Sequence, residues 1–412
     1  MEIKKLRVNG SRLRKTLEEM AKIGATAGGG VDRLALSDED REGRNLFLKW
    51  LGEMNLEITI DELGNIFGRR AGREKQLPPV MAGSHIDSQP KGGRFDGILG
   101  VMGALEVLRT IHENKMETLR PLVIVNWTNE EGSRFSPAMT GSGVWTGKLD
   151  RDWAYQRVDV HGKKFGKELE RIGFKGKQPA KRWPAQAYYE FHIEQGPILE
   201  KEKMTIGVPK GIVTIQWYDV FVEGESNQTG PTPMESRHDA LCAAAEMILK
   251  VNELPAKMGG DMVATVGEIH NAPNSRNIIP GKVRFTVDIR SWDEKLAQKA
   301  ADDVKKDFAG IAGKRGCQLR VEDIWKMERA VFDEKLVQRI WDVAGELGYP
   351  CHRMVSGAGH DASCMNQVAP TAMIFVPSIG GRSHVEVENT SADDCEAGAN
   401  VLLQCVLQSA NE

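Results

Sequence analysis

The segment GSHIDSQPKGGRFDG, at residues 83–97, contains the side chains that decide the fold and the chemistry of this chain. It places His85 and Asp96 eleven residues apart, with Asp87 two residues after the histidine. These are metal-ligand residue types, and the segment also contains glycines at 83, 92, 93 and 97, which let the backbone turn sharply around a side chain. The segment therefore predicts a loop that presents a histidine and acids to one site.

The elements predicted around this segment alternate between strand and helix. An apolar stretch over 79–82 predicts a strand that leads into it, and a helix over 99–111 follows the glycine-rich loop. Residues 122–127 form a nearly continuous apolar run, which is typical of a strand buried on both faces. This order predicts an α/β domain with a largely parallel core. Two helices and a hairpin are predicted before it, over 12–24, 39–54 and 57–69.

The chain is long enough for two domains, and its character changes near residue 209. Beyond that point the predicted order is strand, helix, strand, strand, helix, strand, over 213–223, 236–251, 262–270, 283–290, 294–309 and 318–325. This order is typical of a small α+β sandwich inserted into a larger domain. We therefore expect a discontinuous domain of 1–211 and 327–412, interrupted by a second domain of 212–326.

The composition is that of an ordinary globular protein, with 41% hydrophobic and 27% charged residues. A net charge of −3 gives no reason to expect nucleic acid or an anionic membrane as a partner. We find neither a transmembrane-length apolar run nor a secretory signal in the N-terminal segment. The six cysteines form no CxxC pair, which indicates reduced thiols and a cytoplasmic location.

Three further blocks carry metal-ligand residues beside glycine or an acid. They are Asn129-Glu130-Glu131-Gly132, Phe191-His192-Ile193-Glu194-Gln195-Gly196 and Ser383-His384-Val385-Glu386. A lone histidine is more often an ordinary surface or core residue, and we leave five of them with that reading: His112, His161, His238, His270 and His352. His85, His192 and His384 differ because their blocks are expected at strand ends, where α/β proteins form sites.

Each acid in these blocks has a predicted role. Asp96 alone would be read as part of an Asp-Gly turn, but beside the histidines its two oxygens suit two cations about 3.5–4 Å apart. Asp87 is placed to orient an imidazole by accepting its second N–H. Adjacent acids are usually a solvated surface, yet Glu130 and Glu131 follow a buried strand. At a bend there, Glu131 can bind metal while Glu130 faces a water molecule as the general base and later acid.

These blocks resemble the dinuclear-metal amidohydrolases of the N-carbamoyl-L-amino acid hydrolase, β-ureidopropionase and allantoate amidohydrolase group. The match extends in order from about residue 80 to 390. The resemblance implies an aminopeptidase-like catalytic domain with two divalent metal ions and an inserted lid domain that forms a homodimer. It assigns His85, Asp96 and His192 to one metal, and Asp96, Glu131 and His384 to the other, with Asp96 bridging and Glu130 as the catalytic carboxylate.

The same resemblance assigns substrate-binding residues. Gln195 follows the family's substrate-side glutamine, and the block around His360 places that histidine near the substrate. In the insert, Asn277 and Arg290 lie in lid motifs, and an arginine fork suits a carboxylate. The chain departs from the family at Gln228, which stands where the family has a histidine that stabilises an oxyanion. A glutamine can still donate a hydrogen bond but cannot carry a proton or a charge.

The predicted function is hydrolysis of an N-carbamoyl-L-amino acid to the amino acid, carbon dioxide and ammonia. The histidine at position 192 argues against a peptidase or aminoacylase, because peptidases of the clan usually have an acid there. Allantoate and N-carbamoyl-β-alanine stay open as substrates, since these enzymes share every metal motif, and a non-catalytic homologue is the alternative of another class. The expected partners are a small ureido substrate with a carboxylate and a second copy of the chain, and the metals can be Zn, Mn, Co or Ni.

Overall fold

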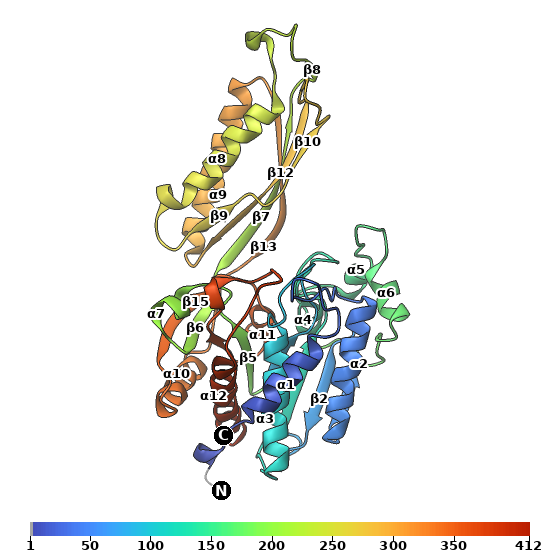
Figure 1. Cartoon of the computed structure of the whole chain (residues 1–412), viewed down its shortest axis with the longest axis vertical. Coiled ribbons are helices and arrows are strands. Elements are labelled where there is room, and N and C mark those ends of the chain that lie inside the picture. Colours follow the sequence, from blue (N-terminus) through green and yellow to red (C-terminus); the bar gives the residue numbers. More distant parts are fainter. Residues whose placement is uncertain (1–2) are drawn as a thin grey trace. The chain divides into compact units, whose positions relative to one another are not determined.

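The computed structural model describes residues 3–412, so the first two residues of the N-terminal segment lie outside it. The chain divides into two compact units, which are Met1–Gly211 with Val331–Glu412 (unit 1) and Ile212–Ala330 (unit 2). The predicted end of the inserted domain, at residue 326, lies before the end of the long strand that leads back to unit 1, and unit 2 ends at Ala330. Each unit is shown in Figure 1.

Unit 1 is built on a nine-stranded mixed sheet in the order β1-β2-β4-β3-β5-β16-β6-β14, with β15 paired to β6. Its four central strands, β4, β3, β5 and β16, are parallel, whereas β2 and β6 join them antiparallel. The parallel core is thus confirmed for the centre of the sheet alone. The strands are β1 Glu57–Ile60, β2 Ile66–Arg70, β3 Val80–His85, β4 Leu122–Trp127, β5 Ala187–Ile193, β6 Ile206–Ile212, β14 Ala330–Val331, β15 Cys351–Ser356 and β16 Thr371–Val376.

The helix α3, Ile98–Glu113, is the central helix of unit 1 and packs on β3 and β5. It is buried along most of its length because α1 and α12 cover its other side. Two glycines permit the close approach to β5, since a Cβ at Gly100 would lie 2.3 Å from the carbonyl oxygen of Phe191 and one at Gly103 2.6 Å from its ring. This packing fixes α3 directly against the strand that carries His192.

The remaining helices of unit 1 surround this centre. They are α1 Gly10–Met20, α2 Asp38–Glu53, α4 Thr140–Thr146, α5 Arg151–Tyr155, α6 Phe165–Arg171, α7 Ile198–Glu202, α10 Glu334–Glu346, α11 Asp361–Met365 and α12 Ala392–Ala410, with short 3-10 turns at Ile3–Lys5 and Ile379–Gly381. The predicted α/β class is confirmed by this arrangement of helices around a central sheet.

Unit 2 is a five-stranded antiparallel sheet with two helices packed on it. The sheet order is β10-β12-β7-β13, with β9 also paired to β12, and a separate two-stranded ribbon joins β8 and β11. Residues such as Val220, Met247, Phe285 and Phe308 form its own core. The elements are β7 Thr214–Glu223, β8 Asn227–Gln228, α8 Ala240–Met258, β9 Val263–Thr265, β10 Ile269–Ala272, β11 Ile278–Ile279, β12 Lys282–Ser291, α9 Glu294–Lys314 and β13 Gln318–Met327, with a 3-10 turn at Met234–Ser236.

One predicted strand of unit 2, over 262–270, is wrong as a single element. The chain forms two short strands there, because β9 pairs with Asp288–Arg290 and β10 with Lys282–Phe285 of the same neighbour. Between them the backbone leaves the ladder, and the Glu268 N–H is bound by the side-chain hydroxyl of Thr286 at 3.1 Å. A local break of this kind leaves no mark in the apolar pattern.

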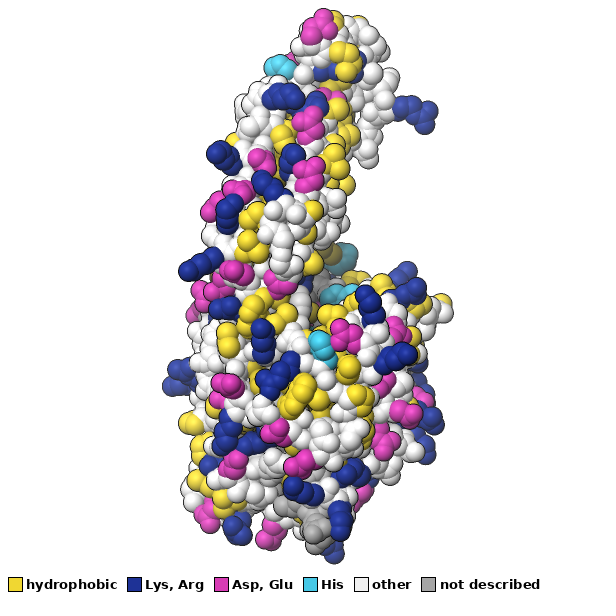
Figure 2. Space-filling view, turned by 90° about the vertical axis from the view of Figure 1, so that its left-hand side faces the viewer, with side chains coloured by type: hydrophobic (Ala, Val, Ile, Leu, Met, Phe, Trp, Pro, Cys, Tyr) yellow, Lys and Arg dark blue, Asp and Glu magenta, His cyan; other side chains and the backbone are white. Residues whose placement is uncertain are grey.

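The molecular surface carries both signs of charge. Figure 2 shows lysine and arginine side chains interspersed with aspartate and glutamate over the face in view, in line with the small net charge of −3. Within residues 3–412, the structure contains no helix that is both long and apolar enough to cross a membrane.

Candidate metal centre

The candidate centre lies where parallel strands of unit 1 end. His85 is the last residue of β3, His192 lies near the end of β5, and Glu130 and Glu131 come three and four residues after the end of β4. Because β3, β4 and β5 are parallel, their carboxyl ends meet at one edge of the sheet. Asp96 reaches the same edge from the loop before α3.

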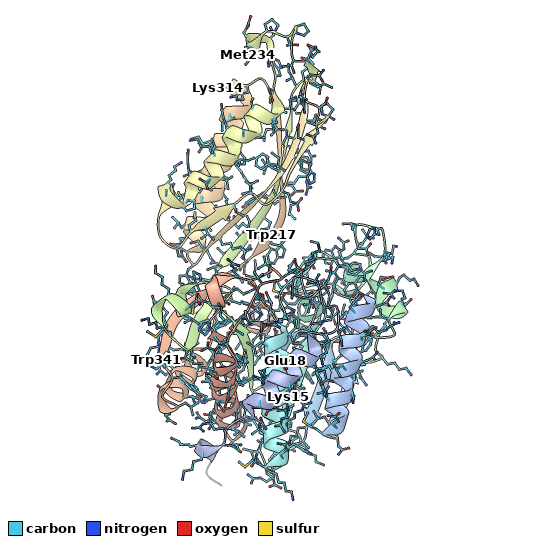
Figure 3. All side chains as sticks on the ribbon, viewed as in Figure 1. Lys15, Glu18, Trp217, Met234, Lys314 and Trp341 are labelled. Carbon is cyan, nitrogen blue, oxygen red and sulfur yellow. The ribbon has the colours of Figure 1, made fainter. Side chains whose placement is uncertain are left out.

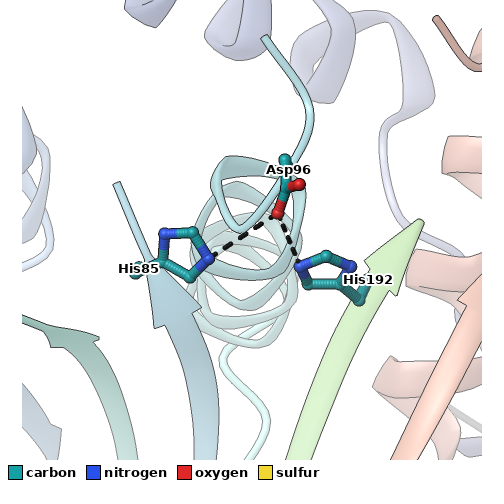
Figure 4. Close-up of side chains that lie close together, drawn as sticks. All are labelled: His85, Asp96 and His192. Atoms are coloured by element: carbon teal, nitrogen blue, oxygen red, sulfur yellow. Dashed lines mark ion pairs between the residues drawn. The ribbon is translucent and has the colours of Figure 1, made fainter. Parts of the chain in front are cut away.

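The first group of candidate ligands consists of His85, Asp96 and His192 (Figure 4). One oxygen of Asp96, Oδ1, lies 3.8 Å from His85 Nε2 and 3.1 Å from His192 Nε2. All three side chains are buried. Their three ligand atoms lie within 4.8 Å of one another, which suits coordination of a single cation.

The second group consists of Asp96, Glu131 and His384. The other oxygen of Asp96, Oδ2, lies 3.2 Å from His384 Nε2, which in turn is 3.6 Å from Glu131 Oε2. The two oxygens of Asp96 thus face different groups, as a bridging carboxylate requires. Mixed imidazole and carboxylate donors fit divalent cations such as Zn, Mn, Co or Ni.

The buried carboxyl groups of the candidate centre lie close together, which favours the binding of cations. Burial and the neighbouring Asp96 raise the pKa of Glu131 to about 8. Burial, together with Asp361 and Glu131, raises the pKa of Glu130 well above its ordinary value. Burial opposes ionisation of Asp96 too, but hydrogen bonds from His192 and His384 hold the pKa of that carboxyl well below its usual range. Burial lowers the pKa of His85 to about 4, which keeps its imidazole neutral and able to bind metal.

Glu130 stands beside both groups without belonging to either. Its Oε2 lies 3.4 Å from His85 Nε2, and the side chain is buried. The bend that separates Glu130 from Glu131 begins at Asn129, whose φ of 57° lies in the left-handed region. The Asn129 side chain fixes that bend by donating to the Phe135 carbonyl at 2.7 Å and to Thr140 Oγ1 at 2.8 Å.

Asp87 acts on the centre differently from the role predicted for it. His85 Nδ1 lies 2.9 Å from the main-chain carbonyl of Asp87, while the nearest oxygen of the Asp87 carboxylate is 3.7 Å away. The carboxylate instead accepts the backbone N–H groups of Glu130 and Glu131, each at 3.3 Å. The expected carboxylate–imidazole contact is therefore wrong, because those two amides at the bend occupy the carboxylate.

Two other predicted residues of unit 1 lie at the centre. Gln195 Nε2 donates to Asp96 Oδ2 at 2.7 Å, and among the described residues its buried Oε1 has no partner. His360 is buried, its ring packs edge-on against His192 at 4.6 Å, and its Nε2 lies 2.9 Å from Ser356 Oγ. The structure thus brings Gln195 to the second group and His360 behind the first.

The predicted residues of unit 2 fall into two places. Gln228 and Asn277 lie together at the β8–β11 ribbon, where the Thr229 N–H donates to the Asn277 carbonyl at 3.0 Å. Arg290 lies near the other end of β12, and its guanidinium binds Asp288 at 2.7–3.2 Å.

The two places are the ends of unit 2. β12 follows the ribbon at Lys282 and continues to Ser291, which at about 3.4 Å per residue is about 30 Å. Figure 3 labels Met234 in the segment that follows β8, and Trp217, which pairs with Asp288, at the opposite end. One small molecule cannot contact both ends of the same unit.

The structure adds supporting residues that sequence reasoning missed. Glu388 is buried and accepts the N–H groups of Phe95 and Asp96, each at 3.0 Å, and it lies 2.8 Å from the hydroxyl of Ser383. It therefore ties the loop of Asp96 to the loop of His384. Gln89 donates to Glu131 Oε2 at 2.7 Å.

A further buried carboxylate lies beneath the first group. Glu190 accepts the Ser84 hydroxyl and the Ala362 N–H, each at 2.7 Å. It thereby joins the strand of His85 to the helix after His360. The sequence signal for Glu388 was its place two residues after Glu386 in a ligand block, whereas Glu190 sits inside an apolar strand with no such signal.

Comparisons with known proteins place this site in a family context. The model of peptidase family M20/M25/M40 matches residues 81–408. The chain is 43% identical over 404 residues to an N-carbamoyl-L-amino-acid amidohydrolase from Rhizobium meliloti, with 98% of this chain and 97% of that protein covered. It is 35% identical over 417 residues to an allantoate amidohydrolase from Bacillus subtilis (strain 168), with 100% of both covered. The crystal structure of a hydantoinase/carbamoylase family amidase from Burkholderia vietnamiensis is similar with a TM-score of 0.94 and 46% identity, covering 99% of both chains.

Proposed function

The chain belongs to peptidase family M20/M25/M40, and from this membership we propose that it is a metal-dependent amidohydrolase that cleaves N-carbamoyl-L-amino acids. The observation that carries the proposal is the position of Asp96, whose two oxygens face two groups of ligands with Glu130 beside them. This is the arrangement that activation of water between two cations requires. The amidohydrolase from Rhizobium meliloti, 43% identical, supports the carbamoyl substrate.

The ligands proposed for the two cations are those of the two groups. His85, Asp96 and His192 would hold one, and Asp96, Glu131 and His384 the other. When bound, such a pair polarises a carbonyl oxygen and lowers the pKa of water. The Asp87 carboxylate fixes the main chain at Glu131, and Glu388 fixes it at Asp96, so the ligands need little reorganisation on binding.

Glu130 is the proposed proton carrier. It accepts a proton as the oxygen of water forms a bond to the carbamoyl carbon. The bond from that carbon to the amino acid nitrogen then breaks, and Glu130 returns the proton to this nitrogen. The products are the free amino acid and carbamic acid, which decomposes to carbon dioxide and ammonia. Burial raises the pKa of Glu130 above its ordinary value, which makes its carboxylate a stronger base for the first step and keeps the proton on it until the nitrogen leaves.

The substrate carboxylate is proposed to bind Arg290, with Gln195 and His360 near the reacting group. Asp288 now occupies the Arg290 guanidinium, so a substrate carboxylate would compete for the same donors. Gln228 and Asn277 are about 30 Å from Arg290 along the unit. We therefore propose that they act in the site of a second copy of the chain, in a homodimer.

The test is turnover by protein stripped with a chelator and reloaded separately with Mn²⁺, Co²⁺, Ni²⁺ or Zn²⁺. Ammonia release would be followed from N-carbamoyl-L-methionine, its D-isomer, N-carbamoyl-β-alanine and allantoate. We expect metal-dependent turnover of the L-isomer, and activity with Gln228 in place of a histidine.

The outcomes separate mechanism from substrate. A preference for allantoate, the substrate named for the Bacillus subtilis relative, would keep the mechanism and replace the substrate. Bound metal without turnover of any of the four would contradict the proposal and favour a non-catalytic homologue. The cytoplasmic location inferred from the cysteines stays a prediction.

A further inference from the structure

A cavity of about 180 Å³ lies in unit 1 behind the loop that carries Asp96. It is partly open and is bordered by α1, by that loop and by the first turn of α12. None of the candidate metal ligands lines it. The residues that decide its chemistry are Arg14, Leu17, Arg94, Phe95, Thr390 and Ala392.

Arg94 is a half-buried cation with unused hydrogen-bonding capacity. Its guanidinium stacks on the ring of Phe95, 5.3 Å from the centroid. Within residues 3–412 the structure gives it no hydrogen bond and no ion pair, whereas the half-buried Arg12 and Arg134 each bind two carboxylates. A guanidinium of this kind is suited to bind a carboxylate through two parallel hydrogen bonds.

Thr390 is a second unsatisfied group on the same cavity. The residue is only 4% exposed, and among the described residues its Oγ1 has no nitrogen or oxygen partner. The thiol of Cys395, which also lines the cavity, interacts with this hydroxyl, but a thiol is a weak hydrogen-bonding group. A buried hydroxyl without a strong partner is unfavourable. The next residue, Ser391, caps α12 by accepting the Asp394 N–H at 3.0 Å, so the positive end of the helix dipole also lies here.

The remaining lining fits a short hydrocarbon chain and carries little opposing charge. Leu17, Phe95 and Ala392 provide apolar surface. Glu18 also lines the cavity, but it lies 3.5 Å from Arg14, and both are well exposed. In the first turn of α12, the Asp394 carboxylate is bonded to Ser391, and Asp393 is exposed. Of the three charged side chains named in the lining, Arg14 and Glu18 lie close to each other, whereas Arg94 has no ion pair among the described residues.

We propose that this cavity is a binding site for a short aliphatic carboxylate, separate from the metal centre. The carboxylate oxygens accept from Arg94 and from the Thr390 hydroxyl. The hydrocarbon chain lies on Leu17 and Phe95. The proposal does not depend on the proposed reaction, because it concerns residues that take no part in it.

The test is calorimetric titration of the metal-loaded protein with butyrate, with sulfate as an anion that lacks a hydrocarbon chain. Arg94→Met keeps the aliphatic stem over Phe95 and removes the charged hydrogen bonds. We expect it to weaken butyrate binding about 10-fold or more. Thr390→Val keeps the shape and removes the hydroxyl, so we expect a smaller loss, of several-fold. Sulfate should bind more weakly than butyrate.

The control variant is Arg290→Ala, which removes the arginine proposed for the substrate carboxylate in unit 2. Butyrate affinity should be unchanged by it, and metal content and melting temperature should show that each variant is folded. Equal affinity in wild type, Arg94→Met and Thr390→Val would overturn the proposal, as would loss of binding in Arg290→Ala alone. Binding of sulfate as tight as butyrate would overturn the assignment of an aliphatic ligand.

Discussion

The two adjacent acids Glu130 and Glu131 have different surroundings, and this difference separates their expected roles. Glu131 lies within reach of His384 and is held by Gln89. Glu130 lies outside both ligand groups, although it is equally buried in a cluster of acids. Single substitutions of the two should therefore have different consequences for metal binding and for catalysis.

Glu130→Gln should leave the metal content unchanged and lower kcat by about 10²–10⁴-fold, because a glutamine cannot accept or return a proton. Glu131→Gln is the matched variant, since it removes a ligand and should lower the metal content as well. Elemental analysis and ammonia release measure the two effects. Near-normal turnover by Glu130→Gln would end its assignment as the general base.

Asp61 gives a pH-dependent prediction away from the metal centre. Its buried carboxylate accepts N–H groups of Leu63 and Asn65, at 2.8–3.0 Å, yet burial raises its pKa from 3.8 to about 7. The folded state thus binds the proton more tightly than the unfolded state. The contribution of Asp61 to the free energy of unfolding is fully present below about pH 4 and is lost as the pH rises to about 7.

Asp61→Asn removes this titration. We expect the unfolding free energy of the wild type to fall relative to the variant between pH 4 and 7, by up to about 4 kcal/mol for a shift of roughly three pH units. Urea unfolding of both proteins in chelator measures the difference, and the carboxylates of the metal centre cancel. A difference that is constant with pH would contradict the assignment.

The start of α3 decides how the elements build the first ligand group. Gly97 precedes the helix with a φ of 70°, and a Cβ there would lie 2.2 Å from His85 Nε2. Its N–H also lies 3.0 Å from His192 Nε2. The turn between Asp96 and α3 thus needs glycine for its backbone angle and for space.

Gly97→Ala should displace His85 and lower the metal content while the protein stays folded. Gly147→Ala is the control, because Gly147 has a φ of 85° but no atom within 4 Å of its Cβ position. Both variants should lose about 1 kcal/mol from backbone strain. Elemental analysis should show metal loss for Gly97→Ala alone, and equal metal contents would refute the steric argument.

The sequence predicted the elements and blocks that depend on neighbours along the chain. Helices and strands with a clear apolar period were predictable, as were the ligand blocks at strand ends, and the family match confirms the resemblance that these blocks suggested. The role of Glu388 could not be predicted, because it contacts residues 292 and 293 positions away. Nor could the divided strand β9–β10 or the use of the Asp87 carboxylate, since both depend on partners that only the fold supplies.

At the scale of the whole molecule, the predicted substrate-binding residues of unit 2 lie farther apart than one substrate molecule can reach. Arg290 lies at one end of unit 2, and Gln228 with Asn277 at the other. Under the proposed function, a complete site needs two chains, and we propose that Gln228 and Asn277 of one chain act in the site of its partner. This arrangement can be tested with variants that are each inactive.

Glu130→Gln should be mixed with the double variant Gln228→Ala/Asn277→Ala, and the chains exchanged. Each mixed dimer contains one site with an intact Glu130, Gln228 and Asn277. When equal amounts are exchanged, half of the dimers are mixed, so about a quarter of the wild-type activity should return. As the control, Glu130→Gln mixed with the triple variant that combines all three substitutions should stay inactive. Mixed dimers without recovered activity would contradict the shared site.

The insertion of unit 2 within unit 1 has a consequence for synthesis on the ribosome. Unit 2 is continuous in sequence and has its own core, and its first and last strands pair, with Ile215 opposite Met327. Unit 1 lacks β16, a central strand between β5 and β6, and α12 until the last residues emerge. Because domains generally fold as they are translated, the inserted unit should be finished first. The metal ligands that precede unit 2 along the chain must then wait for His384, which is translated after it.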